Sequence, residues 1–125
     1  MCYNFMGKLN CLNKNKDFKR VYTKGKYAAS PCLVTYILKN KLNFRKNTNR
    51  IGITTSKKVG NAVQRNRCRR IIRAAYAQVN NFLVPGNDIV FVAREKTVKL
   101  KTQEILRDMK HQLKRLEVLK YEQNN

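Results

Sequence analysis

Acidic residues are scarce in this 125-residue chain, and this scarcity already indicates the kind of partner it binds. The chain has 7 Asp and Glu residues against 28 Lys and Arg residues, which gives a formal net charge of +21. No acidic residue lies between Asp17 and Asp88, although sixteen basic residues do. Such an excess attracts a phosphate polymer and gives binding that weakens steeply with salt. We therefore expect the partner to be a nucleic acid.

The chain also lacks the groups that a self-contained enzyme or a zinc site needs. Cys2, Cys11, Cys32 and Cys68 form no CxxC pair, and His111 is the one histidine. Zinc sites need clustered thiolate or imidazole ligands. No GxSxG, HExxH or Walker-type phosphate loop is present. We expect no catalytic residue, no metal site on the protein and no small-molecule substrate.

Long apolar runs are absent as well. The sequence contains no run of about 18 apolar residues, which is the length needed to span a bilayer. The segment from Met1 to Leu12 lacks the apolar core of a signal peptide. We therefore expect a cytoplasmic protein that has reduced cysteines and no membrane partner.

The length suits one hydrophobic core and is too short for two. The sequence shows no internal repeat and no linker rich in Pro, Gly or Ser. We expect a flexible N-terminal extension over residues 1–10, a single domain over residues 11–121 and a flexible tail over residues 122–125.

Hydrophobic periodicity predicts three helices, at residues 15–24, 61–80 and about 102–120. Asn15 is expected to cap the first helix, and Gly25 is expected to end it. The predicted buried stripe of the second helix comprises Cys68, Ile71, Ile72, Ala75 and Val79, and that of the last comprises Ile105, Leu106, Met109, Leu113, Leu116 and Leu119.

Three segments rich in β-branched, aliphatic or aromatic residues predict strands, at residues 32–38, 50–55 and 88–93. The Asn-rich segment 40–49 is expected to be a surface loop. In the first strand, Cys32, Val34, Tyr36 and Leu38 would share one face, and Leu33, Thr35 and Ile37 the other. The helix between the second and third strands indicates that these two run parallel within one α/β sandwich.

The segment from Ser56 to Arg73 has the densest positive charge, with seven basic residues among eighteen and no acid. Gly60 permits a turn at which backbone can approach a phosphate closely. The helix that follows directs free N–H groups and its positive dipole end toward an anion. Arg65 and Arg67 follow within two turns, and a guanidinium can engage two phosphate oxygens at once.

The same region resembles a known family. Residues 51–63 read IGITTSKKVGNAV and are followed by Arg65-Asn66-Arg67, which closely resembles the signature of the protein subunit of bacterial ribonuclease P. The resemblance covers roughly residues 9–119. It implies a two-layer α/β (α+β) sandwich with about four strands in a mixed sheet and three helices. It also implies a left-handed crossover between the parallel strands, against the usual right-handed rule.

The resemblance further implies a function in which a large RNA subunit is the catalyst. That RNA, with Mg²⁺ held mainly by RNA and substrate, would remove the 5′ leader of precursor tRNA. The partners would be the ribonuclease P RNA and precursor tRNA. The RNA-binding residues would be Lys57, Lys58, Asn61, Arg65, Asn66, Arg67, Arg69, Arg70 and Arg73. Phe18, Tyr22 and Tyr36 would line a cleft for the single-stranded leader, since aromatic faces stack on unpaired bases with little sequence preference.

Other interpretations stay open at this point. A non-catalytic RNA-binding protein such as a ribosomal component would have a similar composition. A DNA-binding helix-turn-helix protein is a weaker alternative, because the basic helix offers mainly phosphate-type contacts. Phe18 and Tyr22 could also be plain core residues.

Overall fold

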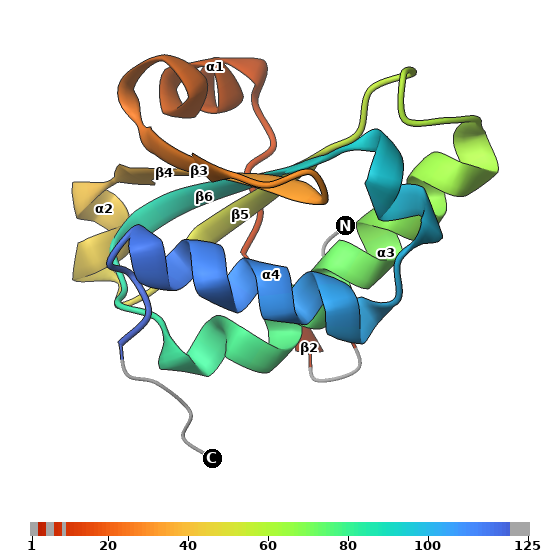
Figure 1. Cartoon of the computed structure of the whole chain (residues 1–125). Helices are drawn as coiled ribbons and strands as arrows, with labels where there is room; N and C mark the ends of the chain where they lie inside the picture. Colours follow the sequence, from red (N-terminus) through yellow and green to blue (C-terminus); the bar gives the residue numbers. More distant parts are fainter. Residues whose placement is uncertain (1–2, 5–6, 9, 121–125) are drawn as a thin grey trace.

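A four-stranded mixed sheet forms the centre of the fold in the computed structural model (Figure 1). Its strands are β3 (Lys26–Ala29), β4 (Leu33–Lys39), β5 (Arg50–Thr54) and β6 (Asn87–Ala93), in the order β3-β4-β6-β5. Strand β4 pairs antiparallel with both β3 and β6, whereas β5 runs parallel to β6. The predicted α/β sandwich, its mixed sheet and its parallel pair are therefore confirmed.

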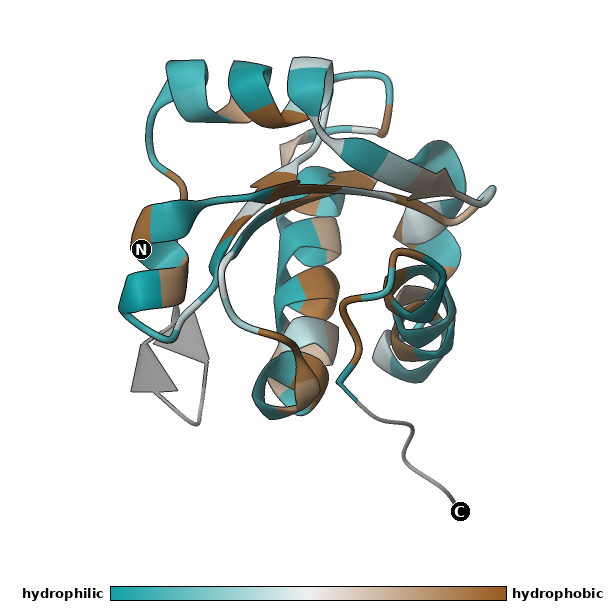
Figure 2. Cartoon of the chain, turned by 90° about the vertical axis from the view of Figure 1, so that its left-hand side faces the viewer, coloured by the Kyte–Doolittle hydropathy of each residue, from teal (hydrophilic) through white to brown (hydrophobic). Residues whose placement is uncertain are grey.

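Helices cover the two faces of the sheet unequally. Helix α1 (Asn15–Lys24) lies alone on one face, whereas α3 (Ala62–Val79) and α4 (Thr102–Arg115) lie side by side on the other (Figure 2). The short helix α2 (Lys41–Arg45) sits between β4 and β5 at one end of the sheet. Part of the face below α1 consequently remains uncovered.

The structure describes the backbone of residues 3–4, 7–8 and 10–120, and side chains from Asn10 onward. Tyr3–Asn4 (β1) and Gly7–Lys8 (β2) pair as a short antiparallel ladder inside the predicted N-terminal extension. The predicted tail at residues 122–125 lies outside the described residues. Two 3₁₀ turns, η1 (Asn80–Phe82) and η2 (Glu95–Lys99), follow α3 and β6.

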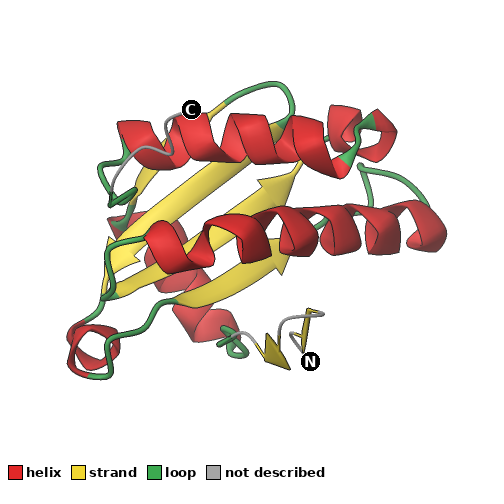
Figure 3. Cartoon of the chain, turned by 90° about the horizontal axis from the view of Figure 1, so that it is seen from below, coloured by secondary structure: helices red, strands yellow, loops and turns green. Residues whose placement is uncertain are grey.

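The crossover from β5 through α3 to β6 is left-handed. Figure 3 views the sheet from the side of α3 and α4; with the strands turned to point upward, β6 lies to the left of β5. Nearly all such connections are right-handed. The handedness that the family resemblance implied is therefore present.

The larger of two cores lies between the sheet and helices α3 and α4. The whole predicted stripe of α3 is buried there, together with Tyr76. Strand β4 turns Leu33 and Ile37 into this core, as its alternation predicts. Strand β6 is buried along nearly its entire length, which fits a strand with helices on both sides.

The smaller core lies beneath α1 and depends on one glycine. Leu12, Val21 and Val90 form its buried centre. A Cβ atom at Gly52 would lie 2.4 Å from Cε1 of Phe18, so any larger residue there would force the ring of Phe18 to shift. The close contact holds α1 against the sheet.

Several boundaries differ from the predictions because tertiary contacts decide them. Helix α4 ends at Arg115 and not near Lys120, since Glu117 has φ of 63° and the chain then pairs with the segment around Leu83. Strand β3 was not predicted, and it exists through its pairing with β4.

The ends of the short helices also differ. The segment 40–49 contains α2 and is not only a loop, because Asn40 caps that helix by accepting a hydrogen bond from the N–H of Leu42. Asn15 is the first residue of α1 and not its cap, and Lys14 occupies the cap position without a side-chain bond.

The cysteines are only partly as expected. Cys32 and Cys68 are free thiols. Cys11 is disulfide-bonded, so the expectation of reduced cysteines is wrong for this residue. The expectation came from the lack of a secretory signal, which carries no information on which thiols lie close together.

A buried carboxylate joins several elements at one end of the sheet. The side chain of Asp88 is fully buried at the start of β6 and accepts two hydrogen bonds from Arg50, from Nε at 2.9 Å and from Nη2 at 3.0 Å. Asn40 and Asn43, from the segment between β4 and β5, donate to the same carboxylate at 3.0 Å and 2.7 Å. Burial by itself would raise the pKa of Asp88, but these donors lower it below the ordinary value.

The second acidic residue at this place is Asp17 in α1. Its carboxylate lies 3.3 Å from the guanidinium of Arg20 and 3.7 Å from that of Arg50. Arg20 also lies 3.7 Å from Asp88. Asp17 and Asp88 are thus both used in ion pairs that fasten α1 to the sheet.

Replacing Asp88 with Asn should destabilise the fold in a pH-dependent way. At neutral pH we expect the free energy of unfolding to fall by about 2–3 kcal/mol. This loss is smaller than that for breaking a fully buried ion pair, because 28% of the Arg50 side chain is exposed. The pKa of Asp88 is lowered in the folded state, so its contribution is complete above the pKa of an unfolded Asp, about 4, and is lost as the pH falls further.

Urea unfolding of the wild type and of Asp88→Asn at several pH values measures this effect. The stability difference should shrink below about pH 4. A difference that stays constant between neutral and acidic pH would contradict the assigned role.

Candidate nucleic-acid interface

The basic segment of residues 56–73, called the helix-start surface below, begins with a well-defined cap. The side chain of Asn61 accepts the N–H of Gln64 at 2.9 Å, and Gln64 Oε1 accepts the N–H of Asn61 at 2.8 Å. Arg65 donates from Nη1 to the carbonyl oxygen of Gly60 at 2.9 Å, which fixes the turn onto the helix. Asn61 and Arg65 therefore shape the turn, while the free backbone N–H groups of the first helical turn remain directed outward.

Two lysines lie on the turn before this cap. Lys57 and Lys58 are exposed in a turn over residues 57–59, and the N–H of Val59 bonds to the carbonyl of Ser56 at 3.0 Å. Val59 itself is buried in the larger core. The turn is thus anchored from below and presents both ammonium groups to the outside, next to the positive end of α3.

Arg67 differs from the other predicted RNA-binding residues because its guanidinium is already used. It donates from Nη1 to the carbonyl of Val98 at 2.6 Å and from Nη2 to that of Leu100 at 2.7 Å. These carbonyls lie in and just after η2, so Arg67 fastens that segment to α3. In this structure Arg67 positions the segment around η2, and its Nη1 and Nη2 atoms are both occupied by protein carbonyls.

The remaining members of the set lie further along α3. Arg70 and Asn66 are exposed, and Asn66 accepts a hydrogen bond from Arg69 at 3.1 Å. Arg73 is half-buried, with its Nε enclosed and without a hydrogen-bond partner. Among the predicted residues, Lys57, Lys58 and Arg70 are thus the cations least engaged by the protein, whereas Arg67 is turned toward η2.

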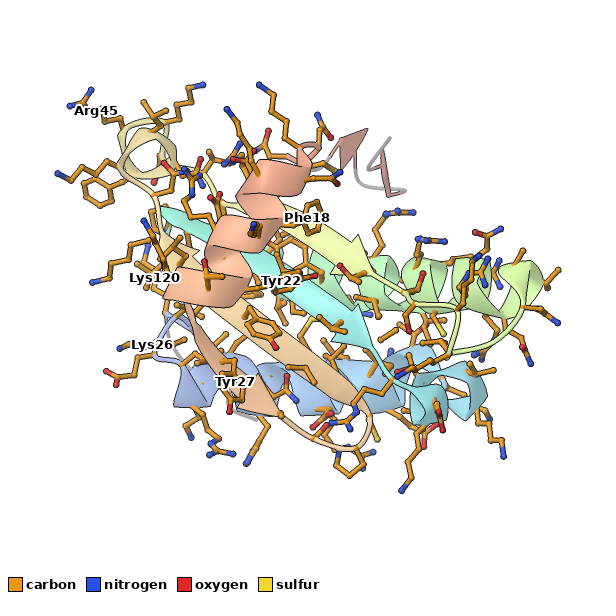
Figure 4. All side chains as sticks on the ribbon, turned by 90° about the horizontal axis from the view of Figure 1, so that it is seen from above. Phe18, Tyr22, Lys26, Tyr27, Arg45 and Lys120 are labelled. Atoms are coloured by element: carbon orange, nitrogen blue, oxygen red, sulfur yellow. The ribbon has the colours of Figure 1, made fainter. Side chains whose placement is uncertain are left out.

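A second surface, called the aromatic strip below, consists of Phe18, Tyr22, Tyr36 and Tyr27. The ring centroids of Tyr22 and Tyr36 lie 5.0 Å apart in an edge-to-face arrangement, and those of Tyr36 and Tyr27 lie 5.6 Å apart. Phe18 follows at 6.5 Å from Tyr22. Figure 4 shows Phe18, Tyr22 and Tyr27 in succession from α1 toward β3. The rings thus form a path from the helix to the edge of the sheet.

The fold positions the strip and leaves it accessible. The hydroxyl of Tyr22 is hydrogen-bonded at 2.6 Å to Thr54 Oγ1 on β5, which ties its ring to the uncovered part of the sheet. Tyr22 is 36% exposed and Tyr27 is 65% exposed, and Tyr36 lies half-buried between them. Phe18 is half-buried against Gly52, so core packing accounts for much of its ring. The three tyrosines have the geometry to stack on unpaired bases.

Sequence reasoning missed Tyr27, which is the most exposed member of the strip. Tyr27 lies opposite Tyr36 in the register of β3 and β4. Only four residues form β3, and Lys26-Tyr27-Ala28-Ala29 has too few apolar positions for a periodicity argument. The signal that could have found it is the Ser30-Pro31 turn before a confident strand, which suggests a hairpin.

The described residues offer no ready site for a divalent cation. No group of three or more His, Cys, Asp or Glu side chains lies together among residues 10–120. The two carboxylates that are close to each other, Asp17 and Asp88, are neutralised by Arg20 and Arg50. The donor set near the strip therefore does not fit Mg²⁺, which prefers carboxylate, phosphate and water oxygens.

Within the described part of the chain, no helix is long and apolar enough to cross a membrane.

Replacing Arg67 should lower stability, whereas replacing Arg70 should not. Arg67→Ala removes two charge-assisted hydrogen bonds and leaves two carbonyls without their donors, so we expect a loss of about 2 kcal/mol. Arg70 is exposed, and Arg70→Ala should change the free energy of unfolding by less than about 0.5 kcal/mol. Arg67→Lys is the matched control, because it keeps the charge but cannot bond both carbonyls in the same way. Equal stability of Arg67→Ala and the wild type in thermal unfolding would overturn the positioning role.

Comparisons with known proteins agree on one family. The family model described as Ribonuclease P matches residues 6–117. The Ribonuclease P protein component of Alkaliphilus oremlandii is 41% identical over 114 residues, which is 91% of this chain and 96% of the relative. That of Clostridioides difficile is 43% identical over 108 residues, covering 86% and 91%.

Solved structures agree with these sequence relatives. The RNase P protein of Staphylococcus aureus superposes with a TM-score of 0.78 at 35% identity, covering 90% of this chain and 99% of that one. The RNase P protein of Thermotoga maritima superposes with a TM-score of 0.70 at 23% identity, covering 92% and 99%, which supports the fold alone.

Proposed function

The chain belongs to the ribonuclease P protein family, and we propose that it acts as the non-catalytic protein subunit of this ribonucleoprotein endoribonuclease. In this role it binds the catalytic RNA subunit and the 5′ leader of precursor tRNA, and so assists removal of the leader to give the mature tRNA 5′ end. We place this activity in the cytoplasm. Family membership favours this function over that of a ribosomal component or of a helix-turn-helix DNA-binding protein.

The observation that carries the proposal is the tyrosine strip on the uncovered part of the sheet. A single-stranded leader offers bases that are not paired, and Tyr22, Tyr36 and Tyr27 offer ring faces and edges at stacking distances from one another. Base stacking depends little on the identity of the base, which suits a subunit whose substrates have different leaders. The strip would hold leader nucleotides close to the cleavage site.

The helix-start surface would bind the RNA subunit. Its exposed cations, Lys57, Lys58 and Arg70, form no ion pair with a described acidic residue, so they are available to phosphate. Asn61 and Arg65 would act by holding the turn in place, and Arg67 by holding η2. Asn66, Arg69 and Arg73 complete the proposed RNA-binding surface.

Catalysis would rest with the RNA subunit and its Mg²⁺. Hydrolysis of the phosphodiester needs metal-bound water and charge stabilisation at the phosphate. The protein's part in the reaction is to bind and orient the leader and to neutralise phosphates, which lowers the concentration of cations that the RNA needs for the same purpose.

Reconstitution tests this division of work. The protein alone should not cleave precursor tRNA, and adding it to a bacterial ribonuclease P RNA should lower the Mg²⁺ concentration needed for leader removal. Leader cleavage by protein from which all RNA has been removed would contradict the proposal. A Mg²⁺ requirement of the RNA that does not change when the protein is added would contradict it as well.

The combined variant Lys57→Ala/Arg70→Ala should weaken binding to the RNA subunit without changing stability. Two lost phosphate contacts should reduce the slope of log K against log[salt] by about 1–2. Filter binding over a salt series measures affinity and slope together. Lys16→Ala/Lys19→Ala on the exposed side of α1 is a charge-matched control. An identical slope for the wild type and for the Lys57/Arg70 variant would speak against the helix-start surface.

A further inference from the structure

A pocket of about 730 Å³ lies at the end of the sheet, at the junction of α1 and β3. The end of α1, the start of β3, the end of β4, helix α2 and the segment after α4 all contribute to its wall. Figure 4 shows Lys26, Arg45 and Lys120 along this margin of the molecule. The volume falls within the range of about 300–1,000 Å³ that is common for sites of small ligands or ligand groups.

The pocket combines an apolar wall with a positive rim. Ile37, Leu38, Val84, Pro85, Leu116 and Val118 supply apolar surface. Lys24, Lys26, Lys39 and Lys41 lie around it and have no ion pair with any described residue, and Glu117 is the one acid in the wall. A site of this kind suits a ligand with both a planar apolar part and negative charge.

Phe44 gives the pocket an aromatic surface. It lies in α2, lines the pocket and is 67% exposed, although its Cβ packs closely against Gly86. Phe44 belongs to neither core of the fold, and Leu42 on the same helix is exposed as well. Together with the lysines it matches the two chemical parts of a nucleotide, which are a base for stacking and a phosphate for ion pairing.

The pocket lies at the end of the sheet, close in sequence to members of the aromatic strip. Tyr22 and Lys24 lie on the last turns of α1, and the pocket residue Lys26 immediately precedes Tyr27 on β3. Leu38 lines the pocket and packs in the same small core cluster as Tyr36. A single strand that leaves the strip can therefore pass around the start of β3 and reach the pocket at the end of the sheet, where Lys24 and Lys26 lie.

We propose that this pocket binds a nucleotide of the leader upstream of those that contact the aromatic strip, with the base on Phe44 and the backbone phosphates on the lysine rim. This inference rests on the proposed function. It predicts that the protein distinguishes leaders by length, because only a long leader reaches the pocket.

The test compares holoenzymes reconstituted with wild-type and variant protein. Affinity is measured for mature tRNA, for precursor tRNA with a leader of about four nucleotides and for precursor tRNA with a leader of about twelve. The pocket variants are Lys39→Ala/Lys41→Ala and Phe44→Leu, the latter keeping apolar contact with Gly86. Lys96→Ala/Lys99→Ala, on exposed residues of η2, is the charge-matched control.

For the wild type we expect the long leader to bind about tenfold more tightly than the short one. Both pocket variants should lose most of this gain, while their thermal stability and their affinity for the short leader stay close to those of the wild type. The control should keep the gain. Pocket variants that retain the full gain, or a wild type that shows none, would overturn the pocket proposal. If the wild type does not distinguish even the short-leader substrate from mature tRNA, the proposed leader-binding function fails as well.

Discussion

The bidentate pair between Asp88 and Arg50 is the interaction on which the rest of the structure depends. It joins β6 to β5 at the point where Asn40 and Asn43 also bond to the carboxylate, and Asp17 extends the network to α1. In a chain with a net charge of +21, these two carboxylates are held inside the fold and not on the basic surface. The pairing therefore stabilises one end of the sheet and holds two of the seven acidic residues in internal ion pairs.

The unequal covering of the sheet turns this charge distribution into two binding surfaces. Helices α3 and α4 close one face, and the left-handed crossover places α3 so that its N-terminus emerges beyond the end of β5 (Figure 3). Helix α1 alone covers only part of the other face, and close packing of Phe18 on Gly52 fixes where it lies. The tyrosines next to it remain accessible because no further element covers them. The proposed binding of two RNAs would use phosphate contacts on one surface and base stacking on the other.

Sequence patterns predicted the parts of the structure that depend on local or periodic signals. The span of α1 with Gly25 at its end, the buried stripe of α3 and the alternation of β4 all follow from residue type and spacing. The parts that escaped prediction depend on distant contacts. Strand β3 exists because β4 is beside it, α4 ends early because the chain pairs with the segment around Leu83, and the binding of Arg67 to the carbonyls after Val98 has no sequence signature. Tyr27 was missed for the first of these reasons, although Tyr22 and Tyr36 were found.

Photo-crosslinking of the assembled holoenzyme distinguishes whether the leader contacts the aromatic strip or the helix-start surface; we expect the strip. A photoreactive base is placed in the leader next to the cleavage site of precursor tRNA, and the crosslinked peptides of the protein are identified. We expect crosslinks to the peptides that contain Tyr22, Tyr27 and Tyr36, and we expect an excess of precursor tRNA without the photoreactive base to suppress them. Crosslinks confined to residues 56–73, or to the outer side of α4, would contradict it.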